Sequence, residues 1–264
     1  MPANRAVAAA LAALGLALTA TACDDAKDST AAAAAAAAAS SPASPSPTER
    51  VASMTGKRLL DKGREAYGKA SSLRMTGFVV DEDSGRRTGV QLAADRKGQC
   101  QLKADVDGTG QFEILRTEGT TLFRPSTATL TAIRGAAVAE RYRDRWFKIP
   151  AGSEYSSLGD LCDLAGLTAF GDPNGSWQAL AGEPGTVAGR ASMGVQLSST
   201  EEGAFTAHLA AEGAMVPLRV EDGWGESAGK NMTLDFTDYD VPVVLPAVPA
   251  GSVVDGDLPA KGAV

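Results

Sequence analysis

An apolar run that ends in small residues and a cysteine constrains this chain more than any other feature. Residues 6–19 are almost entirely Ala, Leu, Val and Gly, and Ala20-Thr21-Ala22 leads directly into Cys23. The run is shorter than the ~18 apolar residues that a membrane-spanning helix needs, and it is rich in Ala rather than Leu. Such a run is typical of a secretory signal peptide, so we expect residues 1–22 to be removed and the remainder to fold outside the cytoplasm.

Cys23 and the residues before it resemble the lipobox of bacterial lipoproteins, in which this cysteine becomes the lipidated first residue of the mature protein. The chain departs from that pattern at Ala20, where the family more often has Leu. The resemblance implies that acyl chains on Cys23, palmitate among them, hold the protein on the extracytoplasmic face of the cell membrane. Multiple chains anchor stably, at roughly 0.8 kcal/mol per buried CH2. The alternative is an ordinary signal cut near Ala22, which would leave Cys23 as a free thiol.

Residues 23–47 are expected to form a tether rather than a folded unit. An unbroken alanine run, 31–39, is followed by a Ser/Pro-rich stretch, and the segment has no large apolar side chain for a core. A flexible chain of this length spans roughly 25–30 Å. The remaining residues, 48–264, can bury a sizeable core, and we expect them to form a single domain.

The charge balance and the side-chain inventory exclude several classes of partner. The formal net charge is -7 and there is no long basic run, so nucleic acid is not an expected partner. His208 is the only histidine, and no Cys/His cluster accompanies it. We therefore expect no metal and no cofactor, and the sequence identifies no protein partner.

Cys100 and Cys162 are the only cysteines after Cys23. Two cysteines in an exported domain most often pair, so we expect a disulfide between them. It would close a loop of about 60 residues, which the chain-entropy model values at about 4 kcal/mol of stability. Two unpaired buried thiols are the less favoured alternative.

The first part of the domain predicts one helix followed by a meander of strands. Ser46-Pro47-Thr48-Glu49 is a helix start with a capping Ser, a Pro at the first helical position and a Glu at the third, and the amphipathic pattern continues to about Ala70. Beyond it, apolar residues alternate, with turn signals between the runs. The predicted strands are 73–79, 90–94, 102–106, 112–115 and 120–123.

The middle of the domain predicts helices, and strands resume after it. Helical segments are expected within 126–142 and 157–170, the latter carrying Cys162. The later candidate strands are 186–197, 204–211, 216–221 and 232–239, followed by an extended tail at 241–246. This order predicts an α+β fold dominated by one antiparallel sheet.

Several short segments resemble the LolA/LppX-type lipoprotein carriers in place and kind. They are Thr121-Leu122-Phe123-Arg124, Asp144-Arg145-Trp146-Phe147-Lys148, residues 215–220, residues 233–240 and Val241-Pro242-Val243. These carriers have an unclosed half-barrel of antiparallel strands with helices on its concave face. The resemblance covers roughly residues 48–255 in layout. It implies an antiparallel unclosed half-barrel sheet with helices on its concave face, and a cavity between sheet and helices for an acyl chain or another hydrophobic ligand.

Strand alternation suggests which side chains would line such a cavity. They are Met75, Val79, Leu92, Leu102, Phe112 and Leu122, with Trp146 at the edge of the helical insert. No chemistry is required, because burial of the apolar surface of the ligand supplies the affinity. The alternative is a non-catalytic envelope interaction or sensory accessory domain with a filled core, in which the same residues pack together.

Two motifs that suggest other functions fit their surroundings poorly. Gly225-Glu226-Ser227-Ala228-Gly229 matches the G-x-S-x-G pattern of serine hydrolases, but it lies between two predicted strands and His208 precedes it in the chain. Residues 105–110 suggest a calcium loop, but Arg116 occupies the position that needs a Glu. We interpret both motifs as turns, and the sequence does not predict an enzyme.

Overall fold

The structure, a computed structural model, describes residues 46–164, 177–199, 203–249, 251–256 and 258–259. A single sheet of twelve strands dominates it, in the order β12-β6-β5-β4-β3-β2-β1-β11-β10-β9-β8-β7. Every neighbouring pair is antiparallel except β12 and β6, which are parallel. The terminal strands of this order do not pair with each other, so the sheet is not closed into a barrel. The predicted α+β class and the unclosed half-barrel are confirmed.

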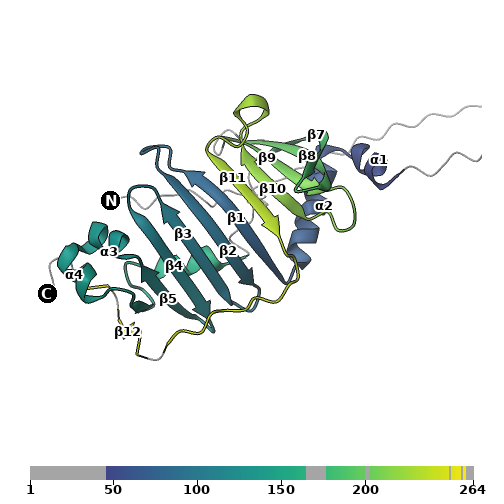
Figure 1. Cartoon of the computed structure of the whole chain (residues 1–264). Coiled ribbons are helices and arrows are strands. Elements are labelled where there is room, and N and C mark those ends of the chain that lie inside the picture. The colour runs from purple at the N-terminus through teal and green to yellow at the C-terminus, as the bar shows by residue number, and fades with distance from the viewer. Residues whose placement is uncertain (1–45, 165–176, 200–202, 250, 257, 260–264) are drawn as a thin grey trace, which may run out of the picture.

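The strands form two meanders that meet in the middle of the sheet (Figure 1). The first contains β1 (Ser72–Val80), β2 (Arg87–Asp95), β3 (Cys100–Val106), β4 (Gly110–Thr117), β5 (Thr120–Pro125) and β6 (Trp146–Ile149). The second contains β7 (Gln178–Val187), β8 (Arg190–Ser199), β9 (Gly203–Ala210), β10 (Pro217–Asp222) and β11 (Met232–Thr237). The two join where β1 pairs with β11, placing Met75 opposite Phe236.

The first helical segment is divided in two, where the sequence predicted one helix. α1 (Pro47–Ala52) has the predicted capping box, in which the Ser46 hydroxyl and the Glu49 carboxylate each accept a hydrogen bond from the other residue's backbone N–H. α2 (Gly56–Lys69) has an N-cap of its own, because Thr55 Oγ1 accepts a hydrogen bond from the backbone of its first turn. A second cap satisfies N–H groups that a new helix start exposes, so the chain can change direction there.

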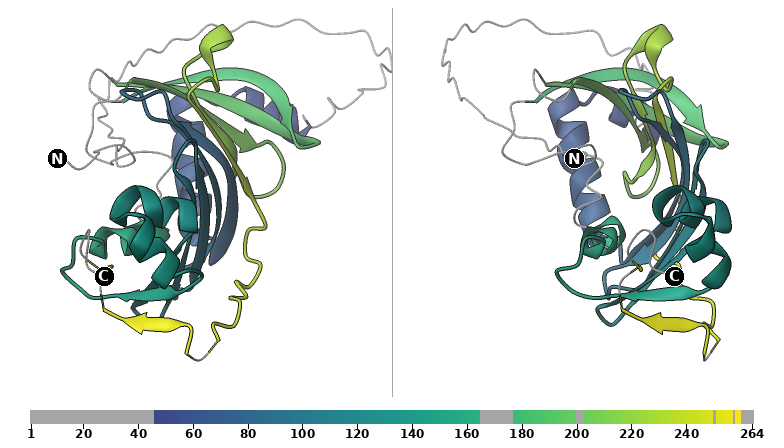
Figure 2. Two further views of the ribbon diagram at one scale, coloured as in Figure 1. Left: turned by 60° about the vertical axis from the view of Figure 1, so that its left-hand side comes forward. Right: turned by 90° about the vertical axis from the view of Figure 1, so that its left-hand side faces the viewer.

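α2 lies against the concave side of the sheet, near β7 and β8 (Figure 2). Gly56 allows its close approach, since an added Cβ would lie 2.4 Å from the Ala179 carbonyl oxygen of β7. Two turns further on, an added Cβ at Gly63 would lie 3.0 Å from the Leu209 side chain of β9. Glycines on this helix face therefore let α2 pack closely on the sheet.

The helical insert between β5 and β7 differs in detail from the prediction. Its helices are α3 (Thr127–Arg134), α4 (Ala136–Arg141) and the 3₁₀ helix η1 (Ser156–Cys162), with β6 between α4 and η1. The part of the predicted second helical segment beyond residue 164 lies outside the described residues. Within the described part of the chain, no helix has the length and apolar character needed to cross a bilayer.

The C-terminal segment runs past the ends of the strands of the first meander to reach the far end of the sheet, as the yellow trace in Figure 1 shows. At its start, the backbone N–H of Asp240 donates to the Ser72 carbonyl oxygen at 3.0 Å, and Ser72 Oγ donates to the Val241 carbonyl oxygen at 2.7 Å. The segment ends in β12 (Val253–Asp255), which adds to β6. The predicted extended tail is thus followed by a further strand.

Candidate ligand-binding face

Strand alternation gives the sheet an inner face toward α2 and an outer face on the opposite side. Two rows of inner-face residues follow from the strand register. The first row is buried throughout and contains Phe236, Met75, Leu92, Leu102, Ile114 and Phe123. It joins side chains of α2, the helical insert and the second meander in one hydrophobic cluster.

The second row, toward the C-terminal end of β1, is less enclosed. We call its half-buried members and their neighbours on the same face the apolar band: Val79, Val90, Phe112, Met232 and Leu234. Leu234 and Val90 both lie opposite Gly77, and Val79 lies opposite Met232. The band thus places partly accessible apolar side chains from β11, β1, β2 and β4 directly beside the buried row.

The opposite end of the inner face is closed by α2 and η1. Tyr67, near the end of α2, is 4% exposed, and its hydroxyl donates a hydrogen bond to the Leu164 carbonyl oxygen at 3.0 Å. Burial raises the pKa of Tyr67 to about 12, because the charged phenolate would lose its hydration. Cys162 of η1 forms the predicted disulfide with Cys100 of β3, and both residues are fully buried. The inner face is therefore sealed at one end and less enclosed at the other.

The predicted cavity residues fall into three groups. Met75, Leu92 and Leu102 lie in the buried row, and Val79 and Phe112 belong to the apolar band. The prediction is wrong for Leu122 and Trp146, which lie on the outer face.

The strand register explains both errors. Phe123 lies opposite Ile114 and Phe147, so it and Phe147 point inward and their neighbours Leu122 and Trp146 point outward. On the outer face, the Arg124 guanidinium lies over the Trp146 ring at 4.6 Å. Sequence reasoning therefore missed Phe123 and Phe147, and it also missed Val90, Met232 and Leu234. An alternating pattern was the available signal for Val90, Met232 and Leu234.

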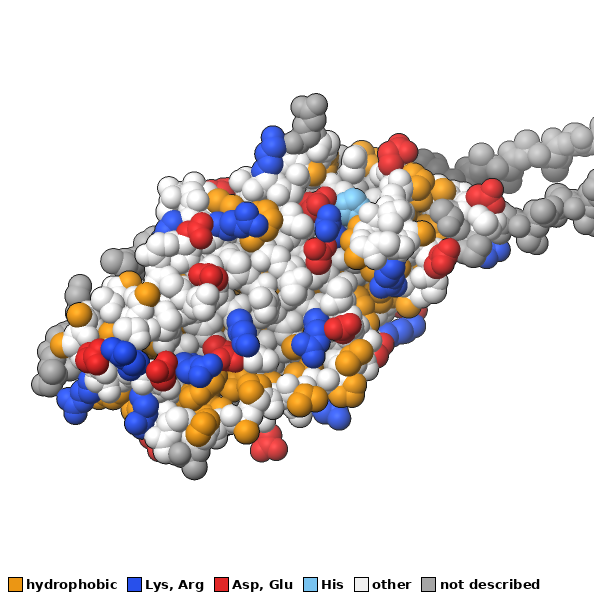
Figure 3. Space-filling model, in the orientation of Figure 1, with side chains coloured by type: hydrophobic (Ala, Val, Ile, Leu, Met, Phe, Trp, Pro, Cys, Tyr) orange, Lys and Arg blue, Asp and Glu red, His pale blue; other side chains and the backbone are white. Residues whose placement is uncertain are grey.

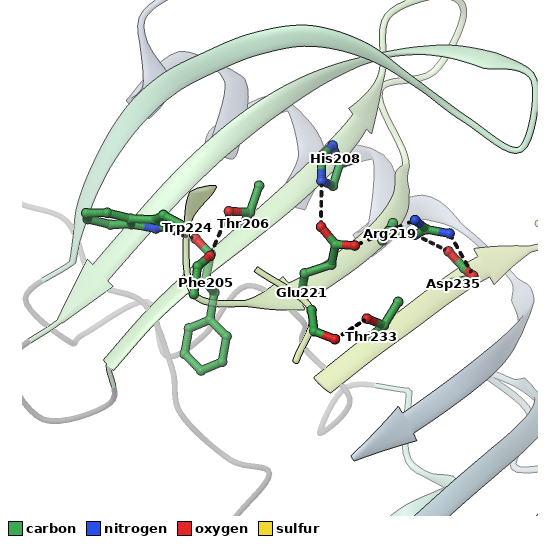
Figure 4. Close-up of polar contacts among 10 residues, drawn as sticks. Phe205, Thr206, His208, Arg219, Glu221, Trp224, Thr233 and Asp235 are labelled. Atoms are coloured by element: carbon green, nitrogen blue, oxygen red, sulfur yellow. Dashed lines mark hydrogen bonds and ion pairs between the residues drawn. The ribbon is translucent and has the colours of Figure 1, made fainter. Parts of the chain in front are cut away.

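Charged side chains cross β9, β10 and β11 on the outer face (Figure 4). His208 Nε2 lies 3.2 Å from Glu221 Oε2, and Arg219 Nη1 lies 3.6 Å from Glu221 Oε1. Arg219 also donates to both carboxylate oxygens of Asp235, at 2.6 and 3.2 Å, and these bonds raise the pKa of the guanidinium. Opposite charges on neighbouring strands stabilise antiparallel pairing, so we interpret this row as a structural network.

The hydrolase-like motif lies in the hairpin between β10 and β11, as the sequence suggested. Ser227 ends the 3₁₀ helix η2 (Gly225–Ser227), and its Oγ donates to the Trp224 carbonyl oxygen at 2.8 Å. Trp224 in turn donates from Nε1 to the Phe205 carbonyl oxygen, also shown in Figure 4. The Ser227 hydroxyl thus serves the structure of its own loop. Residues 105–110, the calcium-like segment, span the end of β3, the turn at 107–109 and the start of β4.

The chain is similar to several solved structures at low sequence identity. No family model and no curated protein matches the chain. The solved structures similar to it include LprF from Mycobacterium bovis, with a TM-score of 0.47 and 12% identity over 73% of this chain and 96% of that chain. A LolA superfamily protein from Nitrosomonas europaea has a TM-score of 0.28 and 10% identity over 73% and 96%. The MucA/MucB complex of Pseudomonas aeruginosa matches with a TM-score of 0.34 and 14% identity over 74% and 59%.

Proposed function

We propose that this protein is a membrane-anchored extracytoplasmic lipoprotein that binds or carries a hydrophobic, lipid-like ligand on the inner face of its sheet. The observation that carries the proposal is the apolar band, in which Val79, Val90, Phe112, Met232 and Leu234 remain half-buried beside a fully buried row. Cys23, with the tether that follows it, would hold the domain at the membrane from which such a ligand comes.

Apolar burial alone can supply the affinity. Each Å² of apolar surface that ligand and band remove from water contributes roughly 25 cal/mol, before the cost of association. The band consists of aliphatic, thioether and phenyl side chains, which suit an acyl chain because neither partner leaves a polar group unpaired. Binding of this kind needs no catalytic residue, so we propose a non-enzymatic role.

The closed end of the inner face limits the side from which a ligand could enter. Tyr67, Leu164 and the Cys100–Cys162 disulfide close the inner face at the far end of the strands from the band. We therefore place the entry of the ligand at the band, with the buried Met75 row forming the inner limit of its site.

A second candidate function has one observation in its favour. Met75, Leu92 and Leu102 are already buried by the chain itself, as a filled core requires. On this alternative, the domain is an envelope interaction or sensory accessory module, and the band is the margin of its core.

The test is native mass spectrometry of the mature full-length protein, extracted from membranes in detergent. We expect a bound mass that denaturation removes, and Val90→Gln should reduce the bound fraction about tenfold, because the amide would be buried against the ligand without a partner. Val244→Gln is the matched control, since Val244 is 80% exposed on the C-terminal segment. A ligand-free mass that persists after incubation with phosphatidylglycerol vesicles would favour the filled-core alternative.

A further inference from the structure

The outer face of the first meander contains a groove of about 630 Å³, on the side of the sheet opposite the side chains of the apolar band. One row of its lining follows directly from the strand register and runs across five strands: Thr76, Gln91, Lys103, Glu113 and Arg124. Ser126 and Asp144 complete its edge near α3 and β6. Figure 3 shows this face, where charges of both signs are interspersed with uncharged atoms.

A glycine contributes to the depth of the groove. Gly89 lies on the outer face between Phe78 of β1 and Asp105 of β3, and it lines the groove. An added Cβ would come no nearer than 3.9 Å to the backbone of Asp105, so the space above Gly89 is open. A side chain there would project into the groove without disturbing the strand.

Part of the lining is held in place by contacts within the protein. Glu113 is only 7% exposed, accepts a hydrogen bond from Gln101 Nε2 at 2.6 Å and forms an ion pair with Arg124. Arg124 is fixed in turn by stacking over Trp146. Polar groups that are already ordered lose little entropy when a ligand binds, which favours recognition.

Other polar groups in the groove are available to a ligand. Thr76, Gln91 and Lys103 are exposed, and among the described residues none of the three has a side-chain hydrogen bond or ion pair. Together they present a hydroxyl, an amide that both donates and accepts, and an ammonium donor in one row across adjacent strands.

The charge and chemistry of the groove select among ligand classes. Two cations, Lys103 and Arg124, lie among three carboxylates, those of Asp105, Glu113 and Asp144, so the groove has no positive excess to attract a phosphate or a polyanion. The strand register points polar side chains into it, while apolar atoms make up about half of its lining, so a ligand that carries both hydroxyl groups and C–H faces matches it. Neighbouring donors and acceptors match vicinal hydroxyl groups, which both donate and accept.

We propose that this outer groove binds a neutral saccharide. Val90 and Phe112 of the apolar band also border the groove. Their side chains point to the inner face, so the site does not depend on the function proposed above. A saccharide there would make direct hydrogen bonds to Gln91 and Lys103 and water-mediated ones to the rest of the lining, as is usual for shallow polar sites.

Saturation-transfer NMR with the mature full-length protein in detergent micelles tests the proposal. The probes are cellotetraose, maltotetraose and chitotetraose, with an anionic hyaluronan tetrasaccharide as the charged comparison. We expect saturable transfer to at least one neutral probe and none to the anionic one. Absence of transfer to all neutral probes, or preference for the anionic probe, would overturn the proposal.

Positions 89 and 90 provide matched variants, because a side chain at position 89 would point to the outer face and the side chain of Val90 points to the inner face. Gly89→Val should weaken saccharide binding more than tenfold by filling the groove, while Val90→Gln should leave it unchanged. Gln91→Ala should weaken it about threefold to tenfold through lost hydrogen bonds. Gln196→Ala, on the outer face of β8, is the control for that change.

These variants also separate the two sites. Equal saccharide binding by wild type, Gly89→Val and Gln91→Ala would place any saccharide elsewhere and overturn the assignment. If Gly89→Val fails to fold, as thermal melting would show, the comparison of Gln91→Ala with Gln196→Ala decides alone. Intact saccharide binding in Val90→Gln, together with a loss of lipid binding, would support two separate sites on the two faces of the sheet.

Discussion

Buried Tyr67 makes the stability of the folded state depend on pH. Its ring is buried, its hydroxyl bonds to the Leu164 carbonyl, and burial raises its pKa to about 12. Tyr239, also packed against this part of the core, has its pKa raised by burial as well, and its hydroxyl donates to the Pro217 carbonyl oxygen at 2.7 Å. Both phenols favour the folded state only while they remain protonated.

We expect the protein to lose stability in alkali through these tyrosines. An unfolded tyrosine ionises near pH 10, so the stabilisation is complete below that pH and is lost as pH rises toward the folded pKa of about 12. For Tyr67 the loss is roughly 2–3 kcal/mol. Urea unfolding at pH 8 and pH 11.5 measures it. Tyr67→Phe should be about 1 kcal/mol less stable at pH 8 but lose less on alkalinisation, and an unchanged pH dependence in this variant would contradict the assignment.

Individual residues also show where sequence reasoning reached its limit. Alternation placed Met75, Leu92 and Leu102 on one face, as the strand register has them, because a polar residue directly precedes each of them. At Leu122-Phe123 and Trp146-Phe147, two large apolar residues are adjacent, and either could point inward. Only the pairing with neighbouring strands decides, and a shift of one residue reverses the face.

η1 is attached to the sheet by a disulfide and by a hydrogen bond. Cys162 at its end is joined to Cys100 on β3, across 62 residues of sequence. Arg116 of β4 adds a hydrogen bond from Nη1 to the Gly159 carbonyl oxygen at 2.9 Å. The short helix thus closes the inner face largely through its attachment to two strands.

Removal of the disulfide should weaken the fold substantially. In the chain-entropy model, Cys100→Ala with Cys162→Ala lowers the free energy of unfolding by about 4 kcal/mol. Urea unfolding monitored by circular dichroism measures the change. Wild-type protein unfolded in a reducing agent should show a similar loss, and a loss below about 1 kcal/mol in both would contradict this account.

The elements that the sequence missed share weak local signals. The meander from β1 to β5 could be predicted because turn dipeptides such as Asp107-Gly108 and Glu118-Gly119 separate alternating runs. β7 was not expected as a separate strand, because Gly and Pro interrupt its alternation and its turn into β8 uses Ala188-Gly189, both at positive φ. β12 has three residues and pairs with a strand distant in sequence, which no local pattern indicates.

The whole molecule presents two chemically different faces, and the part of the chain that the structure describes begins at one end of the sheet. α1, the first described helix, packs near β7 and β8, so the tether would join the domain there. Attachment at one end would leave both the apolar band and the outer groove free of the tether's connection point. The lipid on Cys23 remains a prediction from the sequence.

Loss of Cys23 should release the protein from the membrane. Cys23→Ser removes the acceptor for acylation, so we expect the protein to move from the detergent-soluble membrane fraction to the soluble extracytoplasmic fraction. Fractionation with immunoblotting and intact mass measurement of the mature protein check this. Ser40→Ala, in the tether, is the matched control. A mature wild-type mass without acyl chains would instead support the ordinary signal cut near Ala22.

The position of β1 in the centre of the sheet governs the order in which the sheet can be completed. β1 pairs on one side with β2, its neighbour in sequence, and on the other with β11, where Arg74 lies opposite Thr237. During folding, hairpins can build β1 to β5 early, but contacts between distant segments form slowly. Until residues 232–237 pair with it, β1 exposes a row of unpaired N–H and C=O groups that another chain could extend. We therefore expect β11 to protect the folding chain from aggregation, and a chain truncated before β11 to lack that protection.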